Sequence, residues 1–169
     1  MTTVAPAAQT GAQNRLPVVF QYTVEAYKAF QKLAEMLPNP VTAQVFRKMA
    51  EAERGHRDLL DIKYADASVP RMQITLGGDL RFQDMLEGDL SYREITEMLI
   101  GREKTMAEKL IDFSQNASEE ERNLFRYIGG AKRAHIVLLE RELEMLRMYP
   151  DWFKREDAES LIVHGKPAV

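Results

Sequence analysis

The sequence contains an internal duplication. The segment FRKMAEAERGH, residues 46–56, aligns without a gap with FRYIGGAKRAH, residues 125–135, and Phe, Arg, Ala, Arg and His recur at matching places. The two histidines, His56 and His135, are 135 minus 56, or 79, residues apart. A repeat of this kind constrains the fold to two related halves that pack against each other. The halves differ in charge, because Glu53 in the first is matched by Lys132 in the second.

Apolar residues recur at helical spacing in four long segments. Pro38 ends the first segment, since proline cannot continue a helix. Ser91 is a suitable N-cap for the third, with Glu94 at capping-box spacing, and Ser118 is a suitable N-cap for the fourth. We therefore predict helices over residues 16–37, 41–65, 91–114 and 118–148.

The middle of the chain, residues 66–90, is rich in turn residues and has little helical periodicity beyond a short segment at 80–86. A connection of this length between two helical hairpins can run the length of a bundle. We predict an all-α four-helix bundle over residues 15–149 with a long crossover. A plain all-α domain with a loose central loop is the alternative. Residues 1–14 are a predicted tail and residues 150–169 a C-terminal extension.

Composition limits the functions that this chain can have. It has 169 residues, of which 45% are hydrophobic and 29% charged, with a net charge of -3, so nucleic acid is not an expected partner. It has no cysteine, so any metal must bind to His, Asp or Glu. The first residues lack the pattern of a secretory signal and no apolar run is long enough to span a bilayer, so we expect no membrane association and a cytoplasmic location.

Few polar side chains fall within the apolar stripes of the predicted helices. Five of those that do are Glu53, His56, Glu103, Lys132 and His135. A charged group in an apolar interior costs several kcal/mol unless it is paired or bound to a metal. Glu-x-x-His places two ligand-capable groups one turn apart, which is how helical bundles hold metal ions. The pattern therefore predicts a shared polar centre.

Two more polar residues lie on the inward faces. Lys63 is seven residues past His56, and Glu142 is seven residues past His135. From this matched spacing we predict an internal salt bridge between Lys63 and Glu142 at one end of the bundle.

The segments MAEAERGH, GREK around Glu103 and LFRYIGGAKRAH resemble the ferritin-like superfamily, and most closely its rubrerythrin-type diiron-carboxylate branch. The resemblance covers residues 15–148. It implies that Glu53 bridges two metals, that Glu103 is a terminal carboxylate, and that His56 and His135 are terminal ligands of one metal each. It also implies that the protein binds two irons, and that it either reacts with peroxide or oxygen or stores iron.

Two positions depart from the family pattern. Lys132 stands where a bridging glutamate is expected, and a protonated lysine cannot bind a metal. Family spacing counted back from Phe46 places Thr23 at the ligand position of the first helix. Glu25 takes that place if the first helix slips or bulges. Either Thr23 or Glu25 can therefore be the inward residue at this position, and Glu25 is a further candidate ligand.

The altered charges favour one metal ion or none over two. A single iron or zinc ion held by Glu53, His56, Glu103 and His135 fits the residue types. Two functional hypotheses follow. The first is an iron-dependent peroxide or oxygen oxidoreductase that receives electrons from an external electron-transfer protein. The second is a degenerate, metal-free module in which Lys132 pairs with a carboxylate and which acts by association. We also expect a homo-oligomer, in the simplest case a dimer.

Overall fold

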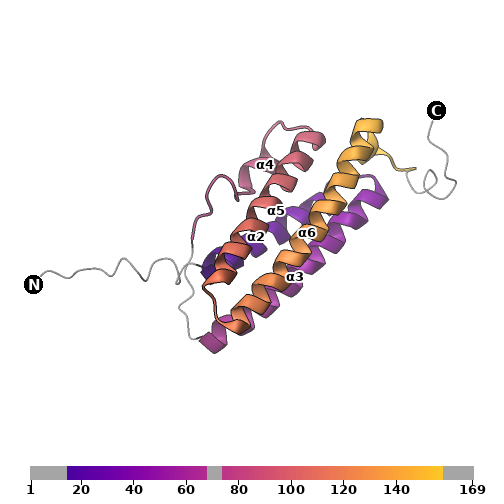
Figure 1. The fold of residues 1–169 in the computed structure, drawn as a ribbon. Coiled ribbons are helices and arrows are strands. Elements are labelled where there is room, and N and C mark those ends of the chain that lie inside the picture. Colours follow the sequence, from indigo (N-terminus) through magenta and orange to yellow (C-terminus); the bar gives the residue numbers. More distant parts are fainter. Residues whose placement is uncertain (1–14, 68–73, 158–169) are drawn as a thin grey trace, which may run out of the picture.

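A computed structural model describes residues 15–67 and 74–157 of the chain. Within these ranges the chain forms helices and no strand, which confirms the all-α prediction (Figure 1). The helices are α2 (Arg15–Met36), α3 (Pro40–Ala67), α4 (Gln83–Glu87), α5 (Tyr92–Gln115), α6 (Glu119–Met148) and the short 3₁₀ helix η1 (Trp152–Lys154). The four long helices agree with the predicted segments to within two residues at each end.

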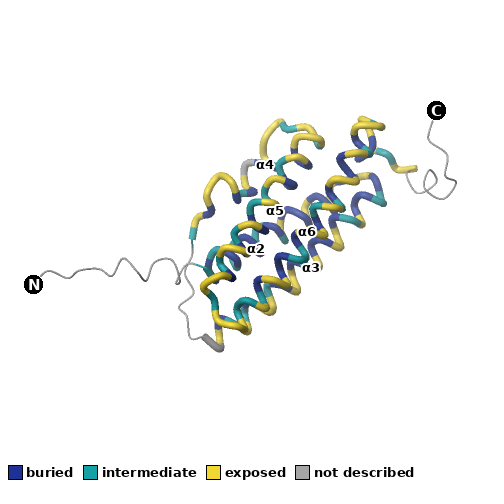
Figure 2. Tube along the Cα trace, in the orientation of Figure 1, coloured by how far each residue is buried: buried dark blue, intermediate teal, exposed yellow. Residues whose placement is uncertain are grey.

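The long helices pack as two hairpins. Helix α2 lies along α3, and α5 lies along α6, while α3 also touches α6 (Figure 1). Each helix turns its buried residues toward the common interior (Figure 2). The result is the ferritin-like four-helix bundle that the two hairpins and the long connection predicted.

Capping side chains fix where three of the helices begin. The hydroxyl of Ser91 accepts a hydrogen bond from the backbone N–H of Glu94, whose carboxylate accepts one from the N–H of Ser91, so the predicted capping box is present. The hydroxyl of Ser118 caps α6 by accepting a hydrogen bond from the N–H of Glu121. Before α3, the Asn39 side chain accepts from the N–H groups of Val41 and Thr42. These bonds satisfy N–H groups that a helix start leaves without partners.

The described part of the connection between the hairpins packs against the bundle. Leu76, Leu80, Phe82 and Met85 are all buried in the core. Arg102 of α5 donates hydrogen bonds to the carbonyls of Arg81 (2.6 Å) and Gly78 (3.2 Å). The short helix predicted at residues 80–86 is α4, Gln83–Glu87. Residues 68–73 of the predicted crossover lie outside the described residues.

The C-terminal extension closes one end of the bundle. Trp152 and Phe153 are buried, and Phe153 contacts the ring of Phe46. Asn39 donates from its side chain to the carbonyl of Trp152 (2.6 Å) and from its backbone to that of Phe153 (3.2 Å). This end of the bundle is therefore held by the loop between α2 and α3. The predicted tail 1–14 and the rest of the extension, 158–169, lie outside the described residues.

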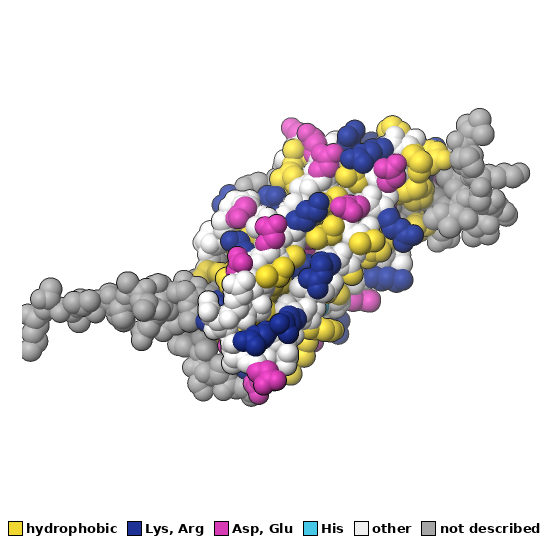
Figure 3. Space-filling view, in the orientation of Figure 1, with side chains coloured by type: hydrophobic (Ala, Val, Ile, Leu, Met, Phe, Trp, Pro, Cys, Tyr) yellow, Lys and Arg dark blue, Asp and Glu magenta, His cyan; other side chains and the backbone are white. Residues whose placement is uncertain are grey.

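Among the described helices, none is both long and apolar enough to cross a membrane. The face shown in Figure 3 carries acidic and basic side chains close together, with hydrophobic patches between them. Because charges of both signs alternate there, that face offers no extended basic surface for an anionic partner.

Candidate metal centre

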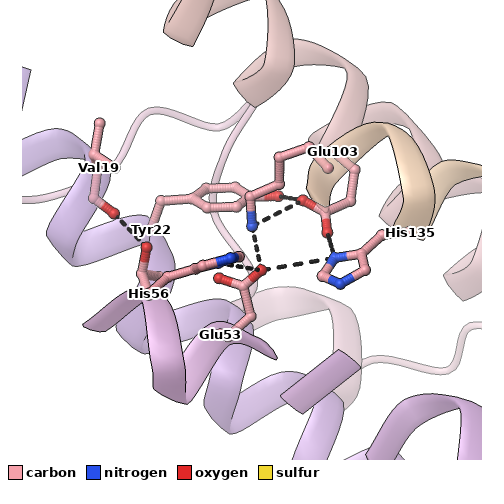
Figure 4. A network of polar contacts seen from close by, with 8 residues as sticks. Val19, Tyr22, Glu53, His56, Glu103 and His135 are labelled. Atoms are coloured by element: carbon pink, nitrogen blue, oxygen red, sulfur yellow. Dashed lines mark hydrogen bonds and ion pairs between the residues drawn. The ribbon is translucent and has the colours of Figure 1, made fainter. Parts of the chain in front are cut away.

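A polar cluster lies in the middle of the bundle. Glu53 comes from α3, Glu103 from α5, and Lys132 and His135 from α6, and all four side chains are buried. Figure 4 shows Glu53, Glu103 and His135 pointing toward one another. Each residue lies within the apolar stripe of its helix, so helix packing alone brings the four together. The convergence predicted from sequence periodicity is therefore observed.

Lys132 pairs with both carboxylates of the cluster. Its ammonium group donates a hydrogen bond to Oε1 of Glu53 and lies 3.5 Å from Oε2 of Glu103. Burial raises the pKa of Glu53, but the charge of Lys132 and the nearby imidazoles of His56 and His135 act against burial, and together they lower that pKa to about 2. Burial lowers the pKa of Lys132, whereas the charges of Glu103 and Glu53 and their hydrogen bonds raise it. Together these raising effects exceed the effect of burial, so the pKa of Lys132 lies above its ordinary value. Both shifts favour the ionised pair.

Glu103 is held from two further directions. The hydroxyl of Tyr22, on α2, donates to Oε2 of Glu103 at 2.6 Å, and Nδ1 of His135 lies 2.8 Å from Oε1 (Figure 4). Burial, followed by the charge of Glu103, raises the pKa of Tyr22 well above its ordinary value. Tyr22 is therefore a neutral donor to the Glu103 carboxylate near pH 7.

Tyr22 was not predicted as a site residue from the sequence. It is completely buried, and its ring lies below the ammonium group of Lys132, which is 4.9 Å from the ring centroid. The signal in the sequence was its position three residues after Val19, on the inward side of the first helix. Cation–π contact and the hydrogen bond to Glu103 together make Tyr22 a structural part of the polar cluster.

His56 lies at the edge of the cluster. Its Nδ1 atom is 3.6 Å from Oε1 of Glu53, and it has no hydrogen-bond partner. Oε2 of Glu53 is also buried without a partner. Buried polar atoms are almost always hydrogen-bonded or bound to an ion or water. Oε2 of Glu53 and Nδ1 of His56 are therefore available to bond to one further group, such as an ion or a water molecule.

On α2, Thr23 points inward and Glu25 does not join the cluster. Thr23 is fully buried, and its hydroxyl donates to the carbonyl of Val19 at 2.7 Å. Glu25 lines a surface pocket with Lys28 and Phe82, and burial raises its pKa. The helix keeps the register that places Thr23 at the altered position. The role of Glu25 as a ligand stays a prediction that this arrangement does not favour.

The predicted salt bridge between Lys63 and Glu142 was wrong. Lys63 pairs with Glu120 at 2.9 Å. Glu142 accepts hydrogen bonds from the hydroxyl of Thr42 and from Nε1 of Trp152, both at 2.8 Å. Helices α3 and α6 run in opposite directions, so residues seven positions after each histidine lie toward opposite ends of the bundle.

The residues present are suited to holding a metal ion. Glu53, Glu103 and His135 each offer one ligand atom, and these atoms lie within 4.8 Å of one another. Imidazole and carboxylate are ligands that zinc and iron accept. His56 is a fourth candidate ligand, because its Nδ1 atom lies 3.6 Å from Oε1 of Glu53. The ligand roles of these four residues stay predictions.

A four-helix bundle of two hairpins with carboxylates and histidines at its centre defines the class of ferritin-like proteins. Within this class the chain belongs to the Rubrerythrin family, whose model matches residues 23–143. The matched region contains Glu53, Glu103, Lys132 and His135 and the entire crossover between the hairpins, and it begins one residue after Tyr22. Family membership therefore agrees with the resemblance seen in the duplicated segments.

Among solved structures, the chain is similar to a hypothetical protein, Pfu-1136390-001, from Pyrococcus furiosus. The two share 22% sequence identity, the TM-score is 0.64, and the match covers 83% of this chain and 93% of the other. At this identity the likeness supports the fold alone. No curated protein matches the chain.

Proposed function

We propose that this protein binds one divalent metal ion per chain, iron or zinc, through Glu53, Glu103 and His135, with His56 as the fourth ligand. The observation that carries the proposal is the pair of buried atoms without partners, Oε2 of Glu53 and Nδ1 of His56, beside three ligand-capable groups within 4.8 Å of one another. A buried carboxylate oxygen without a partner is costly, and an ion at this place removes that cost.

The charge of Lys132 limits the number of ions. Two divalent ions and the ammonium of Lys132 bring +5, against -2 from Glu53 and Glu103, which leaves +3 in a buried site. One ion leaves +1, which a single bound hydroxide or other anion neutralises. An uncompensated buried charge costs several kcal/mol. The site therefore favours one ion, with Lys132 standing in for the charge of a second.

We extend the proposal to iron-dependent reduction of peroxide or oxygen. Bound iron would supply the electron transfer, and the chain's own residues would supply hydrogen-bond donors. The ammonium group of Lys132 and the hydroxyl of Tyr22 both point at the carboxylates of the cluster. The sequence holds no cysteine, so electrons would come from an external electron-transfer protein. We further propose a cytoplasmic homo-oligomer as the working form.

A metal-free module that acts by association is the second candidate. Contact of Lys132 with both carboxylates favours it, because the ammonium neutralises Glu53 and reaches Glu103 without any ion. In this case His135, which lies 2.8 Å from Glu103, completes a purely structural polar network.

Metal analysis separates the two candidates. Protein purified from iron-supplemented cells is measured by mass spectrometry for iron and zinc, before and after mild chelation, beside Glu53→Gln and Glu142→Gln. Glu142 is the matched control, because it is a buried glutamate on the same bundle but away from the cluster. We expect about one ion per chain in the wild type and in Glu142→Gln, and a large loss in Glu53→Gln. Absence of metal from all three proteins supports the metal-free module.

A further inference from the structure

A pocket with a volume of about 330 Å³ lies between α2 and α4. Ala29, Phe82 and Leu86 give it an apolar lining, and polar side chains such as Gln21 and Gln83 complete the wall. Small-molecule sites in proteins are concave and mostly apolar, with volumes of about 300–1,000 Å³. The pocket therefore has the size and the lining of a site for a small molecule.

The ring of Phe82 forms the inner end of the pocket. Phe82 lines the pocket, yet only 4% of its surface is exposed. Its ring centroid lies 5.2 Å from that of Tyr22 and 6.3 Å from that of Phe30. Tyr22 and Phe30 are both completely buried. Phe82 therefore separates the pocket from the interior of the bundle.

The two rings behind Phe82 lead to the same pair of site residues. The hydroxyl of Tyr22 donates to Oε2 of Glu103 at 2.6 Å (Figure 4). The ring of Phe30 lies 5.9 Å from the imidazole of His135. Glu103 and His135 are themselves in contact at 2.8 Å. The pocket is thus separated from two of the proposed metal ligands by two layers of aromatic rings.

The inner layer of rings is interrupted by a small residue. Ala26 lies four residues after Tyr22 and four residues before Phe30. Residues four apart lie on one face of a helix, so the three side chains form a row with a single methyl group in its middle. Phe82 contacts the ring at each end of this row. Its own ring therefore covers the interval between them, and a path opens there when that ring moves away.

The position of Phe82 in the chain allows such a movement. Phe82 directly precedes α4, which has five residues and no side-chain cap. Arg102 of α5 holds the preceding residues through the carbonyls of Arg81 and Gly78. Helices this short have little stability of their own, and such segments open locally while the remaining structure stays folded. Phe82 can therefore leave its place without unfolding of the bundle.

Glu25 supplies a hydrogen-bond acceptor in the wall of the pocket. Its Oε2 atom is shielded from solvent and has no hydrogen-bond partner. A buried carboxylate oxygen without a partner is costly, and a small molecule with an O–H group removes that cost by donating to it. Hydrogen peroxide carries two such groups. The wall of the pocket is therefore suited to this kind of molecule.

We propose that hydrogen peroxide or oxygen reaches the metal centre through this pocket, and that Phe82 sets the largest size of molecule that passes. The inference rests on the proposed function and narrows its substrate class. An organic hydroperoxide carries a carbon group that does not fit beside the Phe82 ring, so it is excluded. Phe82 is a specificity-determining residue that acts through the width of the path.

A second hollow competes as the entrance. A groove of about 680 Å³ between the outward faces of α3 and α6 is lined by His56 and Gly55. A molecule that entered there would meet His56 first, whereas one that enters beside Phe82 would meet Glu103 and His135. The experiment must therefore distinguish the two entrances.

The test measures how fast two probes of different size bind to the cobalt(II)-loaded protein. Azide and imidazole both change the visible absorption of the ion, so stopped-flow absorption gives both rates. In Phe82→Ala the azide rate should rise at least about tenfold, because the ring no longer has to move. The imidazole rate should rise more, because the larger probe depends more on the width of the path. Phe82→Leu, which keeps an apolar side chain, should lie between.

Phe125→Ala is the matched control. Phe125 is a completely buried ring on α6 and does not line the pocket. Its removal leaves a cavity of the same kind elsewhere in the core. Both probe rates should therefore stay at the wild-type values, which separates the width of the path from general loosening of the bundle.

Two further variants fill the competing entrances. Gln83 is exposed and lines the pocket, so Gln83→Trp should slow the binding of azide. Gly55 lines the groove, and a Cβ atom there meets nothing within 4 Å. Gly55→Trp should therefore fold and leave the azide rate unchanged.

A third readout needs no metal. Hydroxyl radicals in solution label tyrosine rings according to their exposure, and mass spectrometry locates the label. Tyr22 and Tyr27 lie in one tryptic peptide, residues 16–28, and Tyr27 is partly exposed, so it serves as the internal reference. In the wild type and in Phe125→Ala, Tyr27 should be labelled and Tyr22 protected. In Phe82→Ala, both should be labelled.

Wild-type probe rates in folded Phe82→Ala and Phe82→Leu would overturn the proposal, as would a protected Tyr22 in Phe82→Ala. Slower azide binding in Gly55→Trp but not in Gln83→Trp would place the entrance at the groove instead. A chain that binds no cobalt contradicts the proposed function. In that case the radical labelling alone decides whether Phe82 separates the pocket from the polar cluster.

Discussion

Lys132 contacts the carboxylate of Glu53 at the centre of the bundle, and both side chains are completely shielded from solvent. The two residues occupy matching places in the duplicated halves. An acid in one half is thus matched by a base in the other half, and the two side chains pair. The proposed limit of one metal ion per chain rests on the charge of this pair.

Lys132→Met should strongly destabilise the metal-free protein. It removes the cation and leaves the buried carboxylates of Glu53 and Glu103 without their counter-charge, and breaking a buried ion pair costs about 3–5 kcal/mol in other proteins. Chemical denaturation in the presence of a chelator measures the effect. Lys104→Met is the control, because Lys104 pairs with Glu140 on the surface, and it should change the free energy of unfolding by less than about 1 kcal/mol. Equal stability of the two variants would contradict the pairing.

Lys132→Glu should increase the number of bound metal ions. The substitution changes the charge of the site by -2 and restores a ligand opposite Glu53, so a second divalent ion becomes tolerable. Metal content per chain should rise from about one toward two, with new near-ultraviolet absorption in the iron-loaded protein. Unchanged metal content, in a variant that is folded, would show that charge does not limit the site.

Tyr22→Phe should lower stability and leave the fold intact. It removes a hydroxyl that donates to Oε2 of Glu103 at 2.6 Å, and hydrogen bonds to charged groups contribute about 1.5–3 kcal/mol. Tyr27→Phe serves as the control, because Tyr27 lies on the same helix, only partly buried, below the guanidinium of Arg57. Thermal and denaturant unfolding should separate the two variants, and identical curves would contradict a role for the Tyr22 hydroxyl.

Glu142→Gln should remove part of the pH dependence of stability. Burial raises the pKa of Glu142 above its unfolded value, so its contribution is fully present below the unfolded pKa and is lost as pH rises through the folded pKa. A glutamine oxygen can still accept from Thr42 and Trp152 without a charge. The variant should therefore gain stability relative to the wild type as pH rises from about 4 to 7, by about 1.4 kcal/mol for each unit of raised pKa.

Glu144→Gln is the matched control for that experiment, since Glu144 lies on the same helix but is exposed beside Arg147. Its difference from the wild type should stay flat across the same pH range. A flat difference for Glu142→Gln as well would mean that Thr42 and Trp152 stabilise the carboxylate enough to cancel the effect of burial.

The sequence predicted the polar cluster because a helix fixes the direction of every side chain. Once the apolar stripe was located, the inward positions of Glu53, Glu103 and Lys132 followed from their spacing. The capping box at Ser91 was equally local, since its two hydrogen bonds join residues three apart. Local rules of this kind need no knowledge of how the helices pack.

Pairing across helices was harder to predict. Lys63 and Glu142 were paired because each follows a histidine by seven residues, but the antiparallel course of α3 and α6 sends them to opposite ends. The partners of Glu142 are Thr42 and Trp152, and Trp152 reaches it only because the extension folds back. The hydrogen bond from Tyr22 to Glu103 joins residues 81 apart, and no local pattern encodes it.

Anomalous diffraction from crystals grown with iron or zinc tests the central claim most directly. The account predicts one metal peak per chain, bonded to Glu53, Glu103 and His135 and near His56, with the ammonium of Lys132 still against the carboxylates. Two peaks, or none at saturating metal, would contradict it.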